Sequence, residues 1–272
     1  MKQNNPIIEL LKWYIDSGID VALENRPVNR LDLSTQSLST KFDTTKSNKP
    51  PSQRKVQTTI SSENILMSQD DTLKNAQINS AQANTLDDLR LAMENFNGCP
   101  LRETAKNLVF GSGNPNSKLM LVGEAPGAEE DRQGVPFVGK AGQLLDKMLA
   151  SINMSREDVY ITNLLPWRPP GNRTPTAAEI DALIPFAERH VELIAPKVLV
   201  FVGGTAAKAF LKSDQGIMKL RGKWLDYSMG YKKRPIHARA ILHPAYLLRQ
   251  PAQKRETWCD LIEIRTKLTQ HK

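Results

Sequence analysis

Several polar side chains and glycines that could take part in ligand binding or catalysis lie at the ends of short apolar runs. The runs are KLMLV (118–122), VYITNLL (159–165), KVLVFV (197–202) and RAIL (239–242). The residues at or near their ends are Glu124, Asn163, the pair Gly203-Gly204, and His243. A carboxylate, an amide and an imidazole can together bind a polar ligand and stabilise developing charge. Taken singly, they could equally be a solvated loop acid, a turn former and a structural histidine.

The apolar runs alternate with helical patterns, which is typical of βαβ units and a mainly parallel sheet. We expect helices over residues 140–151, 176–194, 205–212 and 251–268. Thr176 and Glu179 form a capping box for the second helix, and Pro185 should kink or split it. The sequence predicts an α/β fold: a three-layer α/β/α domain over 85–272 with a central, mainly parallel four-stranded sheet. Ligands bind at the carboxyl ends of such strands, so the polar groups should converge.

The sequence lacks the motifs of several well-known nucleotide-binding, serine-hydrolase and metal sites. The chain has no G-x-G-x-x-G after the first strand, no phosphate-binding G-x-x-x-x-G-K-[ST] loop and no G-x-S-x-G nucleophile turn. The four histidines have no metal-like spacing, and two cysteines cannot form a disulfide framework or a four-ligand metal site. The sequence therefore argues against a dinucleotide enzyme, an NTPase and a serine hydrolase.

The N-terminal third differs in composition from the rest. Residues 6–24 have apolar side chains at roughly helical spacing, so residues 1–31 are predicted to hold an amphipathic helix. This helix would pack either on the main domain or on a partner protein. Residues 32–84 are rich in Ser, Thr, Asn and Gln, which predicts a disordered linker.

Charge and hydropathy restrict the partners. The formal net charge is +8, and the basic excess lies after residue 85, as in a polyanion-binding domain, although it could serve solubility alone. No run of about 18 apolar residues is present, so no membrane association is expected. The first residues lack a secretory pattern, and we expect a cytoplasmic, nucleoid-associated monomer.

Three long motifs closely resemble the family 4 (type-4) uracil-DNA glycosylases. They are GEAPGAEEDRQGVPFVGKAGQLLD (123–146), VYITNLLPWRPPGNRTPT (159–176) and HPAYLLR (243–249). The resemblance covers about residues 86–268 in the family's order and spacing. It implies a monofunctional enzyme that flips uracil out of DNA, hydrolyses its N-glycosidic bond and begins base-excision repair.

The resemblance also implies roles for individual residues. Asn163 would pair with the uracil edge, Phe137 would stack on the base, and His243 would bind uracil O2 as charge develops there. Glu124 would orient the water and stabilise the cationic sugar, and Glu130 would crowd uracil C5 and exclude thymine. Backbone groups of Gly123 to Ala125 would line the base. Alternatively, Phe137 could be an ordinary core residue.

The segment after His243 resembles the family's DNA-intercalation loop. Tyr246, Leu247 and Leu248 would form an apolar wedge and Arg249 would bind a phosphate, although two of the three could be core residues. Further candidate phosphate contacts are Arg168, Arg173, Lys140 and Arg221.

The sequence departs from the family at its iron–sulfur site. Family members usually hold a [4Fe–4S] cluster on four cysteines, and these positions fall on Phe96, Cys99, Trp167 and Leu183. One thiolate cannot hold such a cluster, so we expect an apolar plug in its place, with no metal and no cofactor. Two other functions stay open: a non-catalytic DNA-damage-binding or polymerase-associated module, and a glycosylase for another deaminated base.

Overall fold

The computed structural model describes residues 69–228 and 235–270. These residues belong to one compact unit of the chain, Glu63–Lys272. The helix expected within residues 1–31 and most of the expected linker, 32–68, lie outside the described residues. No helix in the described ranges is long and apolar enough to span a bilayer.

A six-stranded sheet with the order β1-β3-β2-β4-β6-β5 forms the centre of the unit. Its strands are β1 (Ser112–Gly113), β2 (Leu119–Gly123), β3 (Tyr160–Asn163), β4 (Val198–Val202), β5 (Leu225–Tyr227) and β6 (Ile236–Ile241). β3, β2, β4 and β6 are mutually parallel, which confirms the predicted four-stranded core. β1 and β5 add antiparallel edges that the sequence did not predict, because they are too short to show an apolar run.

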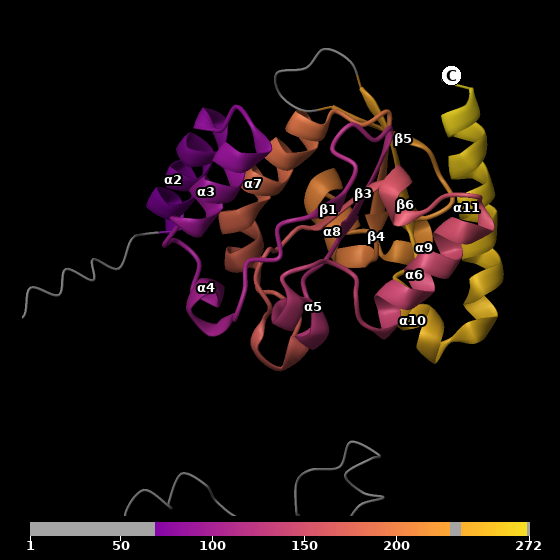
Figure 1. Ribbon diagram of the computed structural model, residues 1–272, viewed down its shortest axis with the longest axis horizontal. Coiled ribbons are helices and arrows are strands. Elements are labelled where there is room, and N and C mark those ends of the chain that lie inside the picture. Colours follow the sequence, from indigo (N-terminus) through magenta and orange to yellow (C-terminus); the bar gives the residue numbers. More distant parts are fainter. Residues whose placement is uncertain (1–68, 229–234, 271–272) are drawn as a thin grey trace, which may run out of the picture. The chain divides into compact units, whose positions relative to one another are not determined.

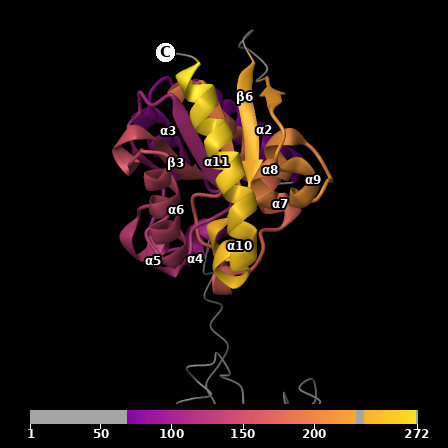
Figure 2. The ribbon, with the colours of Figure 1, turned by 90° about the vertical axis from the view of Figure 1, so that its right-hand side faces the viewer.

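Helices cover both faces of the sheet because its central strands are apolar on both sides. In β2, Met120 and Val122 belong to one hydrophobic core, and Leu119 and Leu121 belong to the other. The first core includes residues of α2 (Gln69–Gln82), α3 (Leu86–Glu94), α7 (Ala177–Ile194) and α8 (Gly204–Leu211). The second includes residues of α6 (Lys140–Ser151), α10 (Pro244–Arg249) and α11 (Lys254–Thr269). Figure 1 shows the resulting three layers, and Figure 2 shows α11 and α6 on one face.

Shorter helical segments connect these layers. They are α4 (Leu101–Thr104), α5 (Ala128–Gln133), α9 (Ile217–Leu220), η2 (Arg156–Asp158), η3 (Pro170–Asn172) and η4 (Pro251–Gln253). The predicted capping box of α7 is present: Thr176 Oγ1 accepts from the Glu179 amide, and the Glu179 carboxylate accepts from the Thr176 amide. Pro185 lies inside α7 without splitting it into two helices.

The predicted linker, residues 32–84, is too long at its C-terminal end. Residues 69–82 form α2, and Ala76, Ser80 and Ala83 in and just after it are buried. α2 lies along α7 (Figure 1) and contributes to the same hydrophobic core. Its sequence is mostly polar, and its buried residues are small, so local composition did not reveal the helix. Packing against α7 accounts for its stability.

Candidate functional site

A cavity of about 480 Å³ opens beside the carboxyl ends of the parallel strands. The strand order reverses at β2, since β3 lies on one side of it and β4 on the other, and such a switch point is where open α/β sheets bind ligands. Predicted residues from several separate loops line the cavity together: Glu124, Ala125, Glu130, Phe137, Asn163, Arg173, His243, Tyr246 and Arg249.

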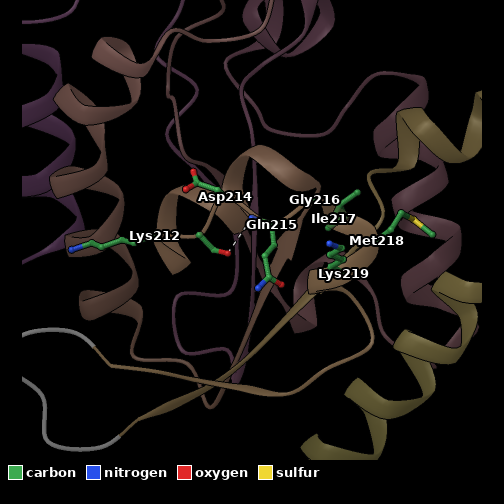
Figure 3. A pocket seen from close by; sticks show the side chains of 8 residues that line it. Lys212, Asp214, Gln215, Gly216, Ile217, Met218 and Lys219 are labelled. Atoms are coloured by element: carbon green, nitrogen blue, oxygen red, sulfur yellow. Dashed lines mark hydrogen bonds between the residues drawn. The ribbon is translucent and has the colours of Figure 1, made fainter.

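Another hollow lies along the segment from Lys212 to Lys219, which runs from the end of α8 into α9. Figure 3 shows its lining side chains, which all come from this one continuous stretch. A hydrogen bond from the Gln215 amide to Ser213 Oγ holds the turn. None of the predicted site residues lines this hollow, so the cavity at the strand ends is the candidate site.

Gly123 lets two side chains approach each other at the end of β2. A Cβ atom built on Gly123 would lie 2.3 Å from Asn163 Oδ1 and 2.6 Å from Phe137 Cζ. Such distances are shorter than any real Cβ contact, so a larger residue would displace both side chains. The structure thus brings Gly123, Asn163 and Phe137 together, as the resemblance implied.

The Asn163 amide is held in the cavity wall with an unused acceptor. Its residue is 5% exposed, and its Oδ1 is buried without a hydrogen-bond partner among the described residues. Buried polar atoms in folded proteins are nearly always bonded, so an orphan of this kind calls for an explanation. A ligand that donates to Oδ1 supplies one.

Phe137 lines the cavity in an unusual backbone conformation. Its φ is 54°, which is a genuine outlier for a bulky side chain. Its ring stacks on the His243 imidazole, with the centroids 5.7 Å apart and the planes 30° from parallel. Although Phe137 belongs to a hydrophobic core, its ring also forms part of the cavity wall.

His243 presents a neutral hydrogen-bond donor. It is the N-cap of α10, and its Nδ1 accepts from the Ala245 amide at 3.1 Å. An accepting Nδ1 carries no proton, so the proton of the neutral ring is assigned to Nε2. Burial, and then the nearby charge of Arg249, lowers the pKa of His243 to about 4. The Gly203 turn after β4 packs against the same ring, since a Cβ there would lie 3.2 Å from His243 Cβ.

The two carboxylates of the cavity differ in how they are held. Glu130 accepts from the Gly127 amide at 3.1 Å and from the Gly139 amide at 2.8 Å. It therefore links the loop that carries Glu124 to the loop that carries Phe137. Glu124 lies at the cavity wall, partly exposed, where its carboxylate can meet a ligand.

One residue of the predicted wedge segment is a core residue. Leu247 is 1% exposed and belongs to a hydrophobic core, which matches the alternative given for this segment. Leu248 is 45% exposed, and Tyr246 and Arg249 line the cavity. An exposed apolar side chain next to a cavity-lining tyrosine keeps the wedge prediction for Tyr246 and Leu248.

The predicted phosphate contacts fall into two groups. Arg221 is ruled out as an available cation, because its guanidinium is bound to Asp260 and Glu256 in an ion network. Arg173 lines the cavity while it makes two hydrogen bonds to Glu179, whose pKa they lower to about 2. Arg168 donates to Asn172 Oδ1, and Lys140 is exposed at the first turn of α6.

The four positions aligned with the family's cluster ligands are all in the protein interior. Phe96, Cys99, Trp167 and Leu183 are 0–3% exposed and share one hydrophobic core. Phe96 packs edge-to-face on Phe186 at 5.0 Å. Burial raises the pKa of Cys99 to about 11, so its thiol stays protonated at neutral pH. These residues do not fit an iron–sulfur cluster, which needs thiolate ligands.

The cavity also has lining residues that the sequence did not single out: Pro126, Gly127, Ala141, Pro169, Asn172 and Ala245. Each lies within or next to one of the three motifs, and that adjacency was the available signal. Their residue types alone indicate no chemistry.

Comparison with known proteins defines the class. The family model described as "Uracil DNA glycosylase superfamily" matches residues 110–262, more than half of the chain, and so places the chain in that superfamily. The type-4 uracil-DNA glycosylase of Archaeoglobus fulgidus is 41% identical over 184 residues, which are 66% of this chain and 92% of the relative. That of Thermotoga maritima is 44% identical over 152 residues, 56% of this chain and 77% of the relative.

The type-4 uracil-DNA glycosylase of Pyrobaculum aerophilum is 38% identical over 182 residues, which are 65% of this chain and 91% of the relative. The chain therefore belongs to the type-4 uracil-DNA glycosylase family. The predicted fold class is confirmed together with the family, because the matched range contains the four parallel strands and their carboxyl-end loops.

Proposed function

We infer that this chain is a uracil-DNA glycosylase, a hydrolase that cleaves the N-glycosidic bond of uracil in DNA and begins base-excision repair. The family supports the reaction, and one observation supports its location. Asn163, whose buried Oδ1 has no hydrogen-bond partner among the described residues, lines a small cavity together with Phe137 and His243. Uracil has an N3–H donor for Oδ1 and an O4 acceptor for the amide of the same side chain.

In the proposed reaction the bond between C1′ of the sugar and N1 of uracil breaks, and its electron pair leaves with the base. Negative charge then develops on uracil O2, where the Nε2 proton of His243 would stabilise it. A donor of this kind typically contributes about 3–4 kcal/mol. Glu124 would stabilise the cationic sugar and orient the water whose oxygen bonds to C1′. The proton that this water loses would neutralise the departing uracil anion.

Base recognition completes this proposal. Phe137 would stack on the flipped uracil, a contact worth about 1–3 kcal/mol. Glu130, held by two backbone amides, would crowd C5 and so exclude thymine. Among the described residues no lysine lines the cavity, which supports a monofunctional enzyme without a Schiff-base step. Tyr246 and Leu248 would fill the gap in the duplex, with Arg249 near a phosphate.

We also propose that the chain works without a [4Fe–4S] cluster. The burial of Phe96, Trp167 and Leu183 in one hydrophobic core with the protonated Cys99 supports this proposal. Iron and acid-labile sulfide analysis of protein purified without oxygen tests it. We expect neither element in stoichiometric amount, and full excision activity for Cys99→Ala. Stoichiometric iron and sulfide that disappear in Cys99→Ala would contradict it.

Further proposals concern partners and location. We propose that the enzyme acts as a monomer on nucleoid DNA in the cytoplasm, and that the amphipathic segment 6–24 binds a partner protein. This segment lies outside the described residues, and its apolar pattern supports the proposal. Light scattering tests the monomer, and co-purification with full-length and 69–272 chains tests the partner.

Excision of uracil from a labelled oligonucleotide, read after alkaline cleavage, tests the enzyme proposal. The protein would be purified in air and treated with chelator. We expect robust cleavage that is lost in Asn163→Ala and kept in Asn116→Ala, which alters an exposed asparagine that does not line the cavity. Tight DNA binding without cleavage would favour the non-catalytic module. Release of hypoxanthine or xanthine instead would favour another deaminated base.

A further inference from the structure

Arg156 holds the backbone of the loop that carries Phe137. Its Nη1 donates to the Pro136 carbonyl at 3.0 Å, and its Nη2 donates to the Phe137 carbonyl. Its Nε donates to Asp146 Oδ1 at 2.6 Å, which ties the guanidinium to α6. One planar group therefore bonds two consecutive carbonyls and a carboxylate, a geometry that lysine cannot reproduce.

The backbone under this contact needs such support. Phe137 has φ 54°, a left-handed conformation that a bulky residue adopts only when its surroundings fix it. On the other side of the loop, the Gly139 amide donates to Glu130 at 2.8 Å. Gly142 lies against the Phe137 carbonyl, because a Cβ there would be 1.7 Å from that oxygen. The loop is thus fixed from several sides, and Arg156 is the contact that binds Phe137 itself.

Arg156 is itself fixed on the sheet. It opens η2, just before β3, where Ser155 and Asp158 form a capping box. The Ser155 amide donates to Asp158 Oδ2 at 2.7 Å, and Gly113 of β1 packs closely on the Arg156 carbonyl. The guanidinium therefore connects the entrance of β3 to the loop that carries Phe137.

We propose that Arg156 is a positioning residue for uracil excision, which sets the Phe137 ring at the stacking position and touches no substrate itself. Arg156 does not line the cavity, so its effect would pass through the Phe137 backbone. This inference rests on the proposed function, in which Phe137 stacks on the flipped base. Displacement of a positioned group by about 1 Å can cost about 100-fold in rate.

A double-mutant cycle tests this role. Single-turnover excision would be measured for Arg156→Met in the natural chain and in a Phe137→Ala background. We expect a loss of about 10- to 100-fold in the natural chain and of less than about 2-fold in the Phe137→Ala background. Equal losses in both backgrounds would overturn the proposal, because they would show an effect that does not pass through Phe137.

Arg189→Met is the matched control. Arg189 on α7 also donates to a backbone carbonyl, Ala83 O at 2.9 Å, and to a carboxylate, Glu192 Oε2 at 2.6 Å. Its side chain is 24% exposed, against 27% for Arg156, and it does not line the cavity. We expect a similar fall in melting temperature for both variants, but a change of less than about 2-fold in excision for Arg189→Met.

Two milder variants apply if Arg156→Met does not fold. Arg156→Lys keeps the positive charge but lacks the planar guanidinium that bonds both carbonyls, and Asp146→Asn weakens only the contact to Arg156 Nε. Both should lower excision, and only when Phe137 is present. Unchanged excision by a folded Arg156→Lys would overturn the proposal. Failure of the natural chain itself to excise uracil would instead overturn the proposed function.

Discussion

Asn163 is the residue to which we assign selectivity for uracil. Its Oδ1 accepts and its Nδ2 donates, which matches N3–H and O4 of uracil and opposes the cytosine pattern. We predict that Asn163→Asp lowers kcat/KM for uracil at least about 100-fold, because a carboxylate would face O4 without a donor. Paired oligonucleotides with uracil or cytosine opposite guanine would measure this loss.

The control for that substitution is Asn116→Asp, which adds the same charge to an exposed residue outside the cavity. It should change uracil excision by less than about threefold, since Asn116 does not line the cavity. A similar loss in both variants would mean that the added charge itself, and not the Asn163 hydrogen-bond pattern, governs the rate.

His243 should remain neutral far below the pH at which histidine ordinarily titrates. Burial lowers the pKa of His243 from 6.5 to about 4. The unfolded chain therefore binds a proton between these values while the folded chain does not, so this residue's stabilisation is present above pH 6.5 and is lost as the pH falls toward 4. Histidine NMR signals, assigned with His243→Asn, should show no His243 titration between pH 8 and 5. A midpoint near 6.5 would contradict the prediction.

At the scale of elements, α6 and the Phe137 loop approach more closely than side chains allow. We predict that Gly142→Ala destabilises the fold by about 2–4 kcal/mol and lowers excision, because the added Cβ would overlap the Phe137 carbonyl at 1.7 Å. Chemical denaturation and single-turnover excision would measure the two effects.

Gly216→Ala is the matched control for this prediction. Gly216 precedes α9 with φ −65°, and nothing lies within 4 Å of a Cβ built there. It should therefore leave stability within about 0.5 kcal/mol and excision unchanged. If Gly142→Ala were as stable as the unsubstituted chain, the close approach at Gly142 would relax without cost, and the prediction would be wrong.

The elements themselves differ in how well the sequence predicts them. β2, β3 and β4 are buried along their whole length and β6 over its last four residues, so each contributes a short, mainly apolar run with a polar residue or glycine near its end. The edge strands β1 and β5 are set by pairing with β3 and β6, which no local pattern encodes. The same limit applies to Leu247 and Leu248, since adjacent leucines differ only through what packs on them.

The candidate site followed from two separate sources. The position of Glu124, Asn163 and His243 at strand ends predicted their convergence by topology alone, and the cavity confirms it. Phe137 and Glu130 came from the resemblance, because neither follows a strand. Arg156 was not foreseen, since its role depends on a backbone conformation that the sequence does not display.

On the scale of the whole molecule, α2 extends the folded domain beyond the boundary predicted at residue 85. Composition placed residues 69–84 in a linker, yet Ala76, Ser80 and Ala83 are buried in the core that α7 shares. Arg189 of α7 also donates to the Ala83 carbonyl at 2.9 Å. The domain that binds DNA therefore extends N-terminal to the residues matched by the family model.

Two shortened chains would isolate this contribution. We predict that a chain starting at residue 85 is less stable than one starting at residue 69 by about 2–4 kcal/mol, because it uncovers the face of α7 that α2 packs on. Chemical denaturation of both chains measures the difference. Uracil excision below the melting temperature should be equal in the two, since no residue of α2 lines the cavity. Equal stability would show that α2 packs without contributing to the fold, and a selective loss of excision would show that α2 acts on the site.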